Sequence, residues 1–84
     1  MNQDTVSISA AAQLTEFSQR QLRNFHSKGY CLEPYKVVSG SITYRRYSSE
    51  HLENLKWLKK FLDEGFTLAA ASKKAFEKLE KGGE

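Results

Sequence analysis

Basic side chains gather in one short stretch of this sequence, SQRQLRNFHSKGY at residues 18–30. Arg20, Arg23 and Lys28 lie in it, and no acidic residue accompanies them. Guanidinium and ammonium groups form charge-assisted hydrogen bonds with phosphate, and arginine also donates in bidentate pairs to the edges of bases. A short basic helix is more often a plain solvated surface, however, so this interpretation needs support from the rest of the chain.

The positive charge of the chain is concentrated in its middle third. Residues 18–47 carry six basic side chains against a single acid, Glu33. Residues 1–17 carry two acids and no base, and residues 48–84 balance seven lysines with seven acids. The net charge of +3 over 84 residues therefore arises wholly from the middle segment. Such a local excess indicates an anionic partner, whereas the C-terminal third has the mixed signs of a solvated helical surface.

Two short helices are predicted around the start of the basic stretch. Ser9 is the expected N-cap of the first helix, which ends near Leu14 or Thr15. Ser18 begins the second helix, and Gln21 completes a capping box with it. Because only about three residues separate them, the two helices are a candidate helix-turn-helix.

The second helix has an apolar side and a polar side. Leu22 and Phe25 form its buried stripe, and Gly29 is the expected end. The polar residues on or near the opposite side are Gln19, Arg20, Arg23, Asn24 and Lys28.

A β-hairpin is predicted after Pro34, which ends any helical continuation. Residues 35–44 read YKVVSGSITY, with β-branched residues on both sides of Ser39-Gly40, and glycine supplies the positive φ that a tight turn needs. The ribbon leads into YRRY at residues 44–47. At least one of these two tyrosines is expected to pack inward, because alternate residues of a strand point to opposite faces.

Two longer helices complete the predicted fold. Ser48 or Ser49 begins the third helix and Gly65 ends it, while Thr67 caps the fourth, which stops at residues 81–83. Apolar residues recur in the third helix at helical spacing: Leu52, Leu55, Trp57, Leu58, Phe61 and Leu62. The predicted fold is therefore mainly α, a winged helix-turn-helix of four helices with a two-stranded hairpin wing between the second and third.

Residues suited to catalysis or metal binding are sparse. Cys31 has no second cysteine and is expected to pack as a small apolar side chain. His26, Cys31 and His51 are scattered rather than spaced as zinc ligands, and adjacent acids at residues 63–64 do not converge on one point. No nucleophile beside a base and no glycine-rich phosphate loop is present. We expect no enzymatic activity, no metal and no cofactor.

The chain is expected to be one domain, residues 1–84, with an ordered core at about 6–80 and frayed ends at 1–5 and 81–84. The N-terminus lacks the basic start and long apolar run of a signal peptide, and no segment is apolar enough to cross a bilayer. These features favour a cytoplasmic protein without membrane contact.

The predicted architecture suits double-stranded DNA. The second helix, at about 18–28, would enter the major groove, where arginine, asparagine and glutamine read base edges. The wing, at about 35–47, would reach the flanking backbone. This interpretation requires Arg20 and Arg23 to share one surface with Arg45 and Arg46.

Several short motifs, in their order and spacing, resemble the DNA-binding domain of the MerR family of bacterial transcription regulators. They are Ile8 before an Ala-rich helix, Leu22-Arg23, Lys28-Gly29, YRRYSS at 44–49 and EGFTL at 64–68. The resemblance covers about residues 6–80. It implies recognition-helix contacts from Ser18, Gln19, Arg20, Arg23, Asn24 and Phe25, and wing contacts from Tyr44, Arg45 and Arg46. To these the charge pattern adds Lys28 and Lys36.

The sequence departs from the family pattern at several positions. Glu16 stands where a small residue, often glycine, is usual, and Asn24-Phe25 replaces a tyrosine pair. Phe25 has no hydroxyl for a phosphate, so we expect it in the core. Leu62 stands where a basic residue is common. Family members continue into a dimerisation helix and a sensing region, so this chain is either a stand-alone protein or a fragment, and a homodimer or an outside effector domain stays open as a partner.

The leading hypothesis is a sequence-specific, nucleoid-associated DNA-binding domain of a bacterial transcription regulator. The first alternative is a small architectural or excisionase-like factor that bends DNA or covers it in arrays. The second is an adaptor that binds a protein through its hairpin and helices without touching DNA.

Overall fold

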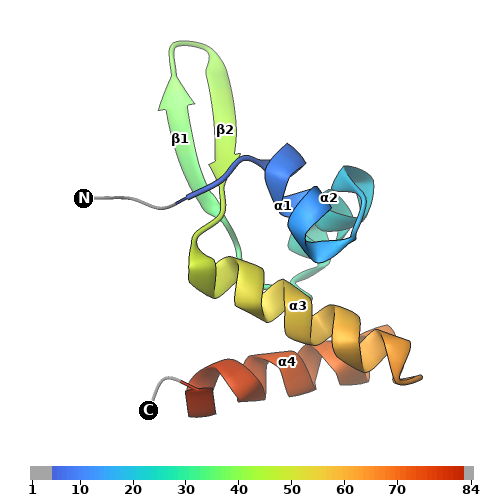
Figure 1. Cartoon of the computed structure of the whole chain (residues 1–84). Helices are drawn as coiled ribbons and strands as arrows, with labels where there is room; N and C mark the ends of the chain where they lie inside the picture. The colour runs from blue at the N-terminus through green and yellow to red at the C-terminus, as the bar shows by residue number, and fades with distance from the viewer. Residues whose placement is uncertain (1–4, 83–84) are drawn as a thin grey trace.

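The computed structural model describes residues 5–82 (Figure 1). Its elements are α1 (Ile8–Thr15), α2 (Gln19–Lys28), β1 (Tyr35–Ser39), β2 (Ile42–Arg46), α3 (Ser49–Asp63) and α4 (Leu68–Gly82). Within these residues, four helices and one antiparallel hairpin between α2 and α3 confirm the predicted winged helix-turn-helix. The frayed ends expected at residues 1–5 and 81–84 fall mostly outside the described range.

Helix α1 begins two residues earlier than the sequence suggested. Ser7, in an extended conformation, is the N-cap, and its side chain accepts a hydrogen bond from the amide of Ala10 at 3.2 Å. Ser9, predicted for that role, lies inside the first turn. Both serines suit a cap, and Ser7 takes the role because it is the last extended residue before the helix begins at Ile8. Glu16 ends α1 in the left-handed conformation with a φ of 67°.

Helix α2 forms as its end signals predict. Ser18 and Gln21 make the complete capping box, and Gly29 ends the helix with a φ of 77°. Leu22 and Phe25 are its buried residues, which confirms the expected apolar stripe and places Phe25 in the core.

The hairpin is a two-stranded antiparallel ribbon whose register sets the faces of its side chains. Its strands pair from Tyr35 opposite Arg46 to Ser39 opposite Ile42, which leaves Gly40-Ser41 as the turn. Gly40 has a φ of 63°, as a two-residue hairpin turn with glycine in its first position requires. In Figure 1 the ribbon projects beyond the helices.

Helix α3 is the centre of the packing, with α4 on one side and α1 on the other (Figure 1). Ser48 is its N-cap, and it ends at Asp63, before Glu64 and Gly65. Ala71 and Ala75 of α4 are fully buried, and such small side chains allow the two long helices to approach closely. The core consists of Ala11, Phe17, Leu22, Phe25, Cys31, Tyr47, Leu55, Leu58, Phe61, Ala71 and Ala75.

Buried polar side chains anchor the segment that joins α2 to the hairpin. Asn54 accepts a hydrogen bond from the amide of Leu32 at 2.8 Å, and Ser72 donates one to the carbonyl of Tyr30 at 2.7 Å. The His51 ring lies 2.9 Å from the amide of Ser48 through Nδ1, so Nε2 carries the proton and donates to the carbonyl of Glu33 at 3.0 Å. Buried polar groups need such partners, and here the partners fix where the hairpin leaves the helical core.

Candidate nucleic-acid interface

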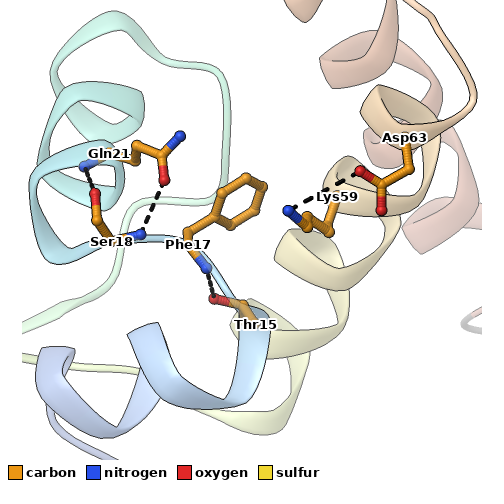
Figure 2. A network of polar contacts seen from close by, with 6 residues as sticks. All are labelled: Thr15, Phe17, Ser18, Gln21, Lys59 and Asp63. Carbon is orange, nitrogen blue, oxygen red and sulfur yellow. Dashed lines mark hydrogen bonds and ion pairs between the residues drawn. The ribbon is translucent and has the colours of Figure 1, made fainter.

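The turn between α1 and α2 is held by local hydrogen bonds (Figure 2). The Ser18 hydroxyl accepts from the Gln21 amide at 3.0 Å, and the Gln21 side-chain oxygen accepts from the Ser18 amide at 2.9 Å. On the α1 side, the Thr15 hydroxyl donates to the carbonyl of Ala11 at 2.7 Å. These bonds set the angle at which α2 leaves the turn. Ser18 is exposed, and its hydroxyl proton stays available to an external acceptor.

Phe17 anchors the turn in the core, a role that the sequence analysis missed. Its side chain is 4% exposed, and its ring meets Phe25 edge-on with centroids 4.9 Å apart. Lys59 of α3 lies over the same ring, 5.5 Å from its centroid. The available signal was an apolar residue just before the N-cap, five residues ahead of the next buried position, Leu22, as in a hydrophobic staple.

The outer face of α2 is exposed and carries basic and amide side chains. Arg20, Arg23 and Asn24 are exposed, and Gln19 is half-buried. A shallow hollow of about 630 Å³ lies along this face, lined by Arg20, Gln21, Arg23, Asn24 and Ser27. Arginine and asparagine are the side chains that read guanine and adenine edges in a major groove, so the face carries both the charge and the hydrogen-bonding groups for that task.

A second hollow joins α2 to the base of the hairpin. It measures about 220 Å³ and is lined by Arg23, His26, Ser27, Glu33, Pro34, Lys36 and Arg45. Lys36 and Arg45 are cross-strand partners, so they share one face of the ribbon. Arg23 lines both hollows and thereby connects the outer face of α2 with the wing. The structure thus brings together basic residues that are 22 positions apart in the sequence.

The two hairpin arginines lie on opposite faces, contrary to the expectation of one surface for both. Arg45 faces the hollow shared with Arg23. Arg46 lies on the other face and donates through Nε to the Thr5 hydroxyl at 3.2 Å and through an Nη atom to the Thr5 carbonyl at 2.9 Å. Tyr44 shares the face of Arg46, because residues alternate along a strand. The cationic surface is therefore formed without Arg46.

The positive charge of this surface has little internal compensation. Among the described residues, the ion pairs are Lys36 with Glu33 at 3.5 Å, Lys59 with Asp63 at 3.9 Å and Lys60 with Glu64 at 3.3 Å. Arg20, Arg23 and Arg45 take part in none of them. Lys28, in the last turn of α2, is exposed and takes part in none either. Four basic groups are thus available to an outside anion.

Below this surface, the ring of His26 bonds with the phenol of Tyr47. The Tyr47 hydroxyl lies 3.1 Å from His26 Nε2. Burial, with a smaller effect from Arg45, lowers the pKa of His26 to about 4, and burial raises the pKa of Tyr47 to about 12. The imidazole is therefore neutral near pH 7 and adds no charge of its own. The sequence analysis named no partner for either histidine.

The fold and this surface define a class of protein: a winged helix-turn-helix domain with a basic helix beside a partly basic wing. The chain matches the model of the MerR HTH family regulatory proteins over residues 6–76. It belongs to that family, and it is a DNA-binding regulator domain. A comparison with curated proteins returned no match.

Residues 5–82 were also compared with the requirements of a metal site, a membrane span and a reactive cysteine. No cluster of three or more histidine, cysteine or acidic side chains that would hold a metal ion occurs in this part of the chain. None of its helices has the length and apolarity needed to span a bilayer. Cys31 is buried, as expected for a packing residue, and burial raises its pKa to about 12.

Proposed function

We propose that this domain binds double-stranded DNA with sequence specificity, as part of a bacterial transcription regulator acting in the cytoplasm on the nucleoid. The observation that carries the proposal is the position of Arg23, which lines the outer face of α2 and also the hollow shared with Lys36 and Arg45. A helix in the major groove and a wing on the adjacent backbone need this continuity of charge.

The polar side chains on the outer face of α2 would read base edges. Gln19, Arg20, Arg23 and Asn24 have donors and acceptors suited to the major groove, and the Gln19 side-chain oxygen lies 3.5 Å from an Arg23 Nη atom. That contact holds the Arg23 guanidinium near the outer face of the helix. Each good bidentate contact discriminates against the wrong base by roughly 1–3 kcal/mol.

The groups around this face would hold phosphates. We assign this role to Ser18 and Lys28 at the two ends of α2, and to Lys36 and Arg45 on the wing. A phosphate in the hollow would displace the weak pair of Lys36 with Glu33, whose side chains are 56% and 74% exposed. Tyr44 and Arg46, on the opposite face of the ribbon, would contribute less.

Binding to duplexes selected from a random library tests the proposal. The selected duplex should bind with an affinity that falls as salt rises, and Arg23→Ala should cost roughly 1–3 kcal/mol of specific binding. The salt slope is the decrease in the logarithm of the binding constant per unit increase in the logarithm of the salt concentration. Arg45→Ala should reduce this slope by about 0.9, the value for one phosphate contact. Unchanged binding by both variants, with the fold intact by circular dichroism, would refute the assigned interface.

Arg46→Ala is the matched control, because Arg46 has the same side chain and is the next residue of the same strand. Its salt slope should stay close to that of the parent chain. An equal loss of slope for Arg45→Ala and Arg46→Ala would contradict an interface formed by one face of the wing.

A further inference from the structure

The hollow between α2 and the hairpin contains a side chain whose charge can change. His26 lies in its wall, beside one acid, Glu33, and three basic residues, Arg23, Lys36 and Arg45. Lys36 already pairs with Glu33 at 3.5 Å. Arg23 and Arg45 take part in none of the ion pairs within residues 5–82. The hollow therefore places two uncompensated positive charges next to an imidazole.

The His26 ring is held in position by Tyr47, which follows the hairpin. His26 Nε2 lies 3.1 Å from the Tyr47 hydroxyl, and the centroids of the two rings are 5.5 Å apart. Tyr47 is fully buried, so its ring is fixed by the core. A phenol hydroxyl can donate a hydrogen bond or accept one, so the contact is compatible with a neutral imidazole and with an imidazolium. His26 can therefore gain a proton without losing its bond with Tyr47.

The surroundings of the ring oppose that proton in the free domain. Burial and then the charge of Arg45 are the main causes that lower the pKa of His26 to about 4, and Nδ1 is buried without a hydrogen-bond partner. The charged and titratable groups that face the ring come from several elements: Arg23 of α2, Glu33 before the hairpin, Lys36 and Arg45 of the hairpin, Tyr47 after it and His51 of α3. Glu33 is the one carboxylate among them, so an imidazolium here meets a net repulsion.

An anion in the hollow would offset this repulsion. The hollow measures about 220 Å³, so an anion inside it lies close to the His26 ring as well as to Arg23 and Arg45. An opposite charge within about 4–6 Å favours the charged form of a titrating group. The anion would also compensate the two guanidinium groups that oppose the imidazolium. Occupation of the hollow and protonation of His26 should therefore favour each other, and such a coupling is reciprocal.

We propose that the hollow binds a phosphate-like anion together with a proton on His26. The proton comes from the solvent and goes to the ring nitrogen that lacks one, and no other covalent bond changes. In the function proposed above, on which this step rests, the anion is one phosphate group of the duplex backbone. DNA binding then becomes tighter as the pH falls toward 5, because the bound domain holds more protons than the free domain.

Affinity measured at pH 7 and at pH 5, at constant salt, tests this coupling. The probe is the duplex selected from the random library, and the proteins are the parent chain and His26→Gln, which cannot become charged at this position. A bound anion that raises the midpoint of His26 from about 4 by one or two pH units makes binding roughly 2- to 10-fold tighter at pH 5 than at pH 7. The parent chain should exceed His26→Gln by this factor. An equal pH dependence of the two proteins would overturn the proposal.

Proton uptake is a readout that a purely structural role of His26 would not change. Calorimetry of duplex binding at pH 5, in two buffers with different ionisation enthalpies, counts the protons that enter the complex. The parent chain should take up roughly half a proton more than His26→Gln, as a midpoint raised by one or two pH units implies. Circular dichroism at pH 5 verifies that both proteins are folded. Equal uptake by the two proteins would contradict a proton on His26.

A titration without DNA separates the anion site from the proposed function. The probe is sulfate, compared with chloride at equal ionic strength. The chain has two histidines, so the NMR signal of the His26 ring is the one that is missing from His26→Gln. Sulfate should move the midpoint of this signal to higher pH in the parent chain and in Arg46→Ala, and by less in Arg45→Ala, whose hollow has lost a cation.

The two arms have distinct outcomes. A midpoint that is the same in sulfate and in chloride would overturn the anion site. Absence of duplex binding together with a midpoint raised by sulfate would refute the proposed DNA binding and support the coupled site.

Discussion

The Tyr47 hydroxyl and the His26 ring are joined by a contact of 3.1 Å between residues 21 positions apart. Tyr47 follows β2 and is fully buried, while His26 belongs to the last turn of α2. Because burial raises the pKa of Tyr47 to about 12, its hydroxyl keeps its proton and shares a hydrogen bond with Nε2 of the neutral imidazole. This bond links the base of the wing to α2, beside the hollow that Arg23 and Arg45 line.

Tyr47→Phe should destabilise the domain while leaving its fold intact. The phenyl ring keeps the packing, but His26 Nε2 loses its hydrogen-bond partner, and an unsatisfied buried polar atom costs about 1–3 kcal/mol. Urea denaturation followed by circular dichroism measures the free energy of unfolding. Tyr44→Phe is the control, since Tyr44 is 48% exposed and its loss of a hydroxyl should change stability by less than about 0.5 kcal/mol. Equal effects of the two changes would contradict the role of the bond.

Stability should fall in mild acid because of His26. Its pKa of about 4 in the folded domain lies below the ordinary 6.5, so the unfolded chain binds more protons between these two values. The stability that the folded domain keeps by holding His26 neutral is fully present above pH 6.5. It falls as the pH is lowered and is lost near pH 4. It amounts to about 3 kcal/mol at most.

Urea denaturation at a series of pH values measures this effect. His26→Gln retains an acceptor for Tyr47 and removes the titrating ring, so its free energy of unfolding should vary much less over the same range. A variant as sensitive to acid as the parent chain would assign the effect to carboxylates instead.

Glu16→Gly should stabilise the domain. Glu16 is the one described residue other than glycine with a positive φ, at 67°, and the left-handed conformation costs roughly 1 kcal/mol for a residue with a side chain. Thermal denaturation should show a higher midpoint. Glu64 offers a matched comparison, because it also follows the last residue of a helix but has a φ of −82°. Glu64→Gly should lower the midpoint, since glycine there adds freedom to the unfolded chain and the change also removes the exposed ion pair of Glu64 with Lys60.

Asn54→Ala should loosen the segment between α2 and the hairpin. Asn54 is fully buried and accepts the hydrogen bond of the Leu32 amide, which would be left without a partner. We expect a loss of about 1–3 kcal/mol and faster hydrogen exchange at Leu32. Asn24→Ala, at an exposed position, should leave both quantities nearly unchanged. Unaltered exchange at Leu32 in Asn54→Ala would show that other contacts hold this segment.

The helices of this domain were predictable because their signals are local. The capping box of Ser18 and Gln21 and the end at Gly29 act within three or four residues, and the structure confirms them. The choice between Ser7 and Ser9 was not predictable, since both are good N-caps and only the extended conformation of Ser7 decides. The core position of Phe17 was not predicted, since this residue lies before the N-cap and outside the apolar stripe of α2.

The sequence by itself determined the order of elements, the family and the location of the charge excess, since these depend on residue types and short spacings. The tertiary structure decided which basic residues share a surface. Alternation along β2 places Arg45 and Arg46 on opposite faces of the hairpin wherever the hairpin lies. Which of these faces turns toward α2 is determined by hydrogen bonds across 18 to 42 residues, made by Asn54, Ser72 and His51. Such long-range hydrogen bonds leave no periodic pattern in the sequence, so they became visible only with the folded chain.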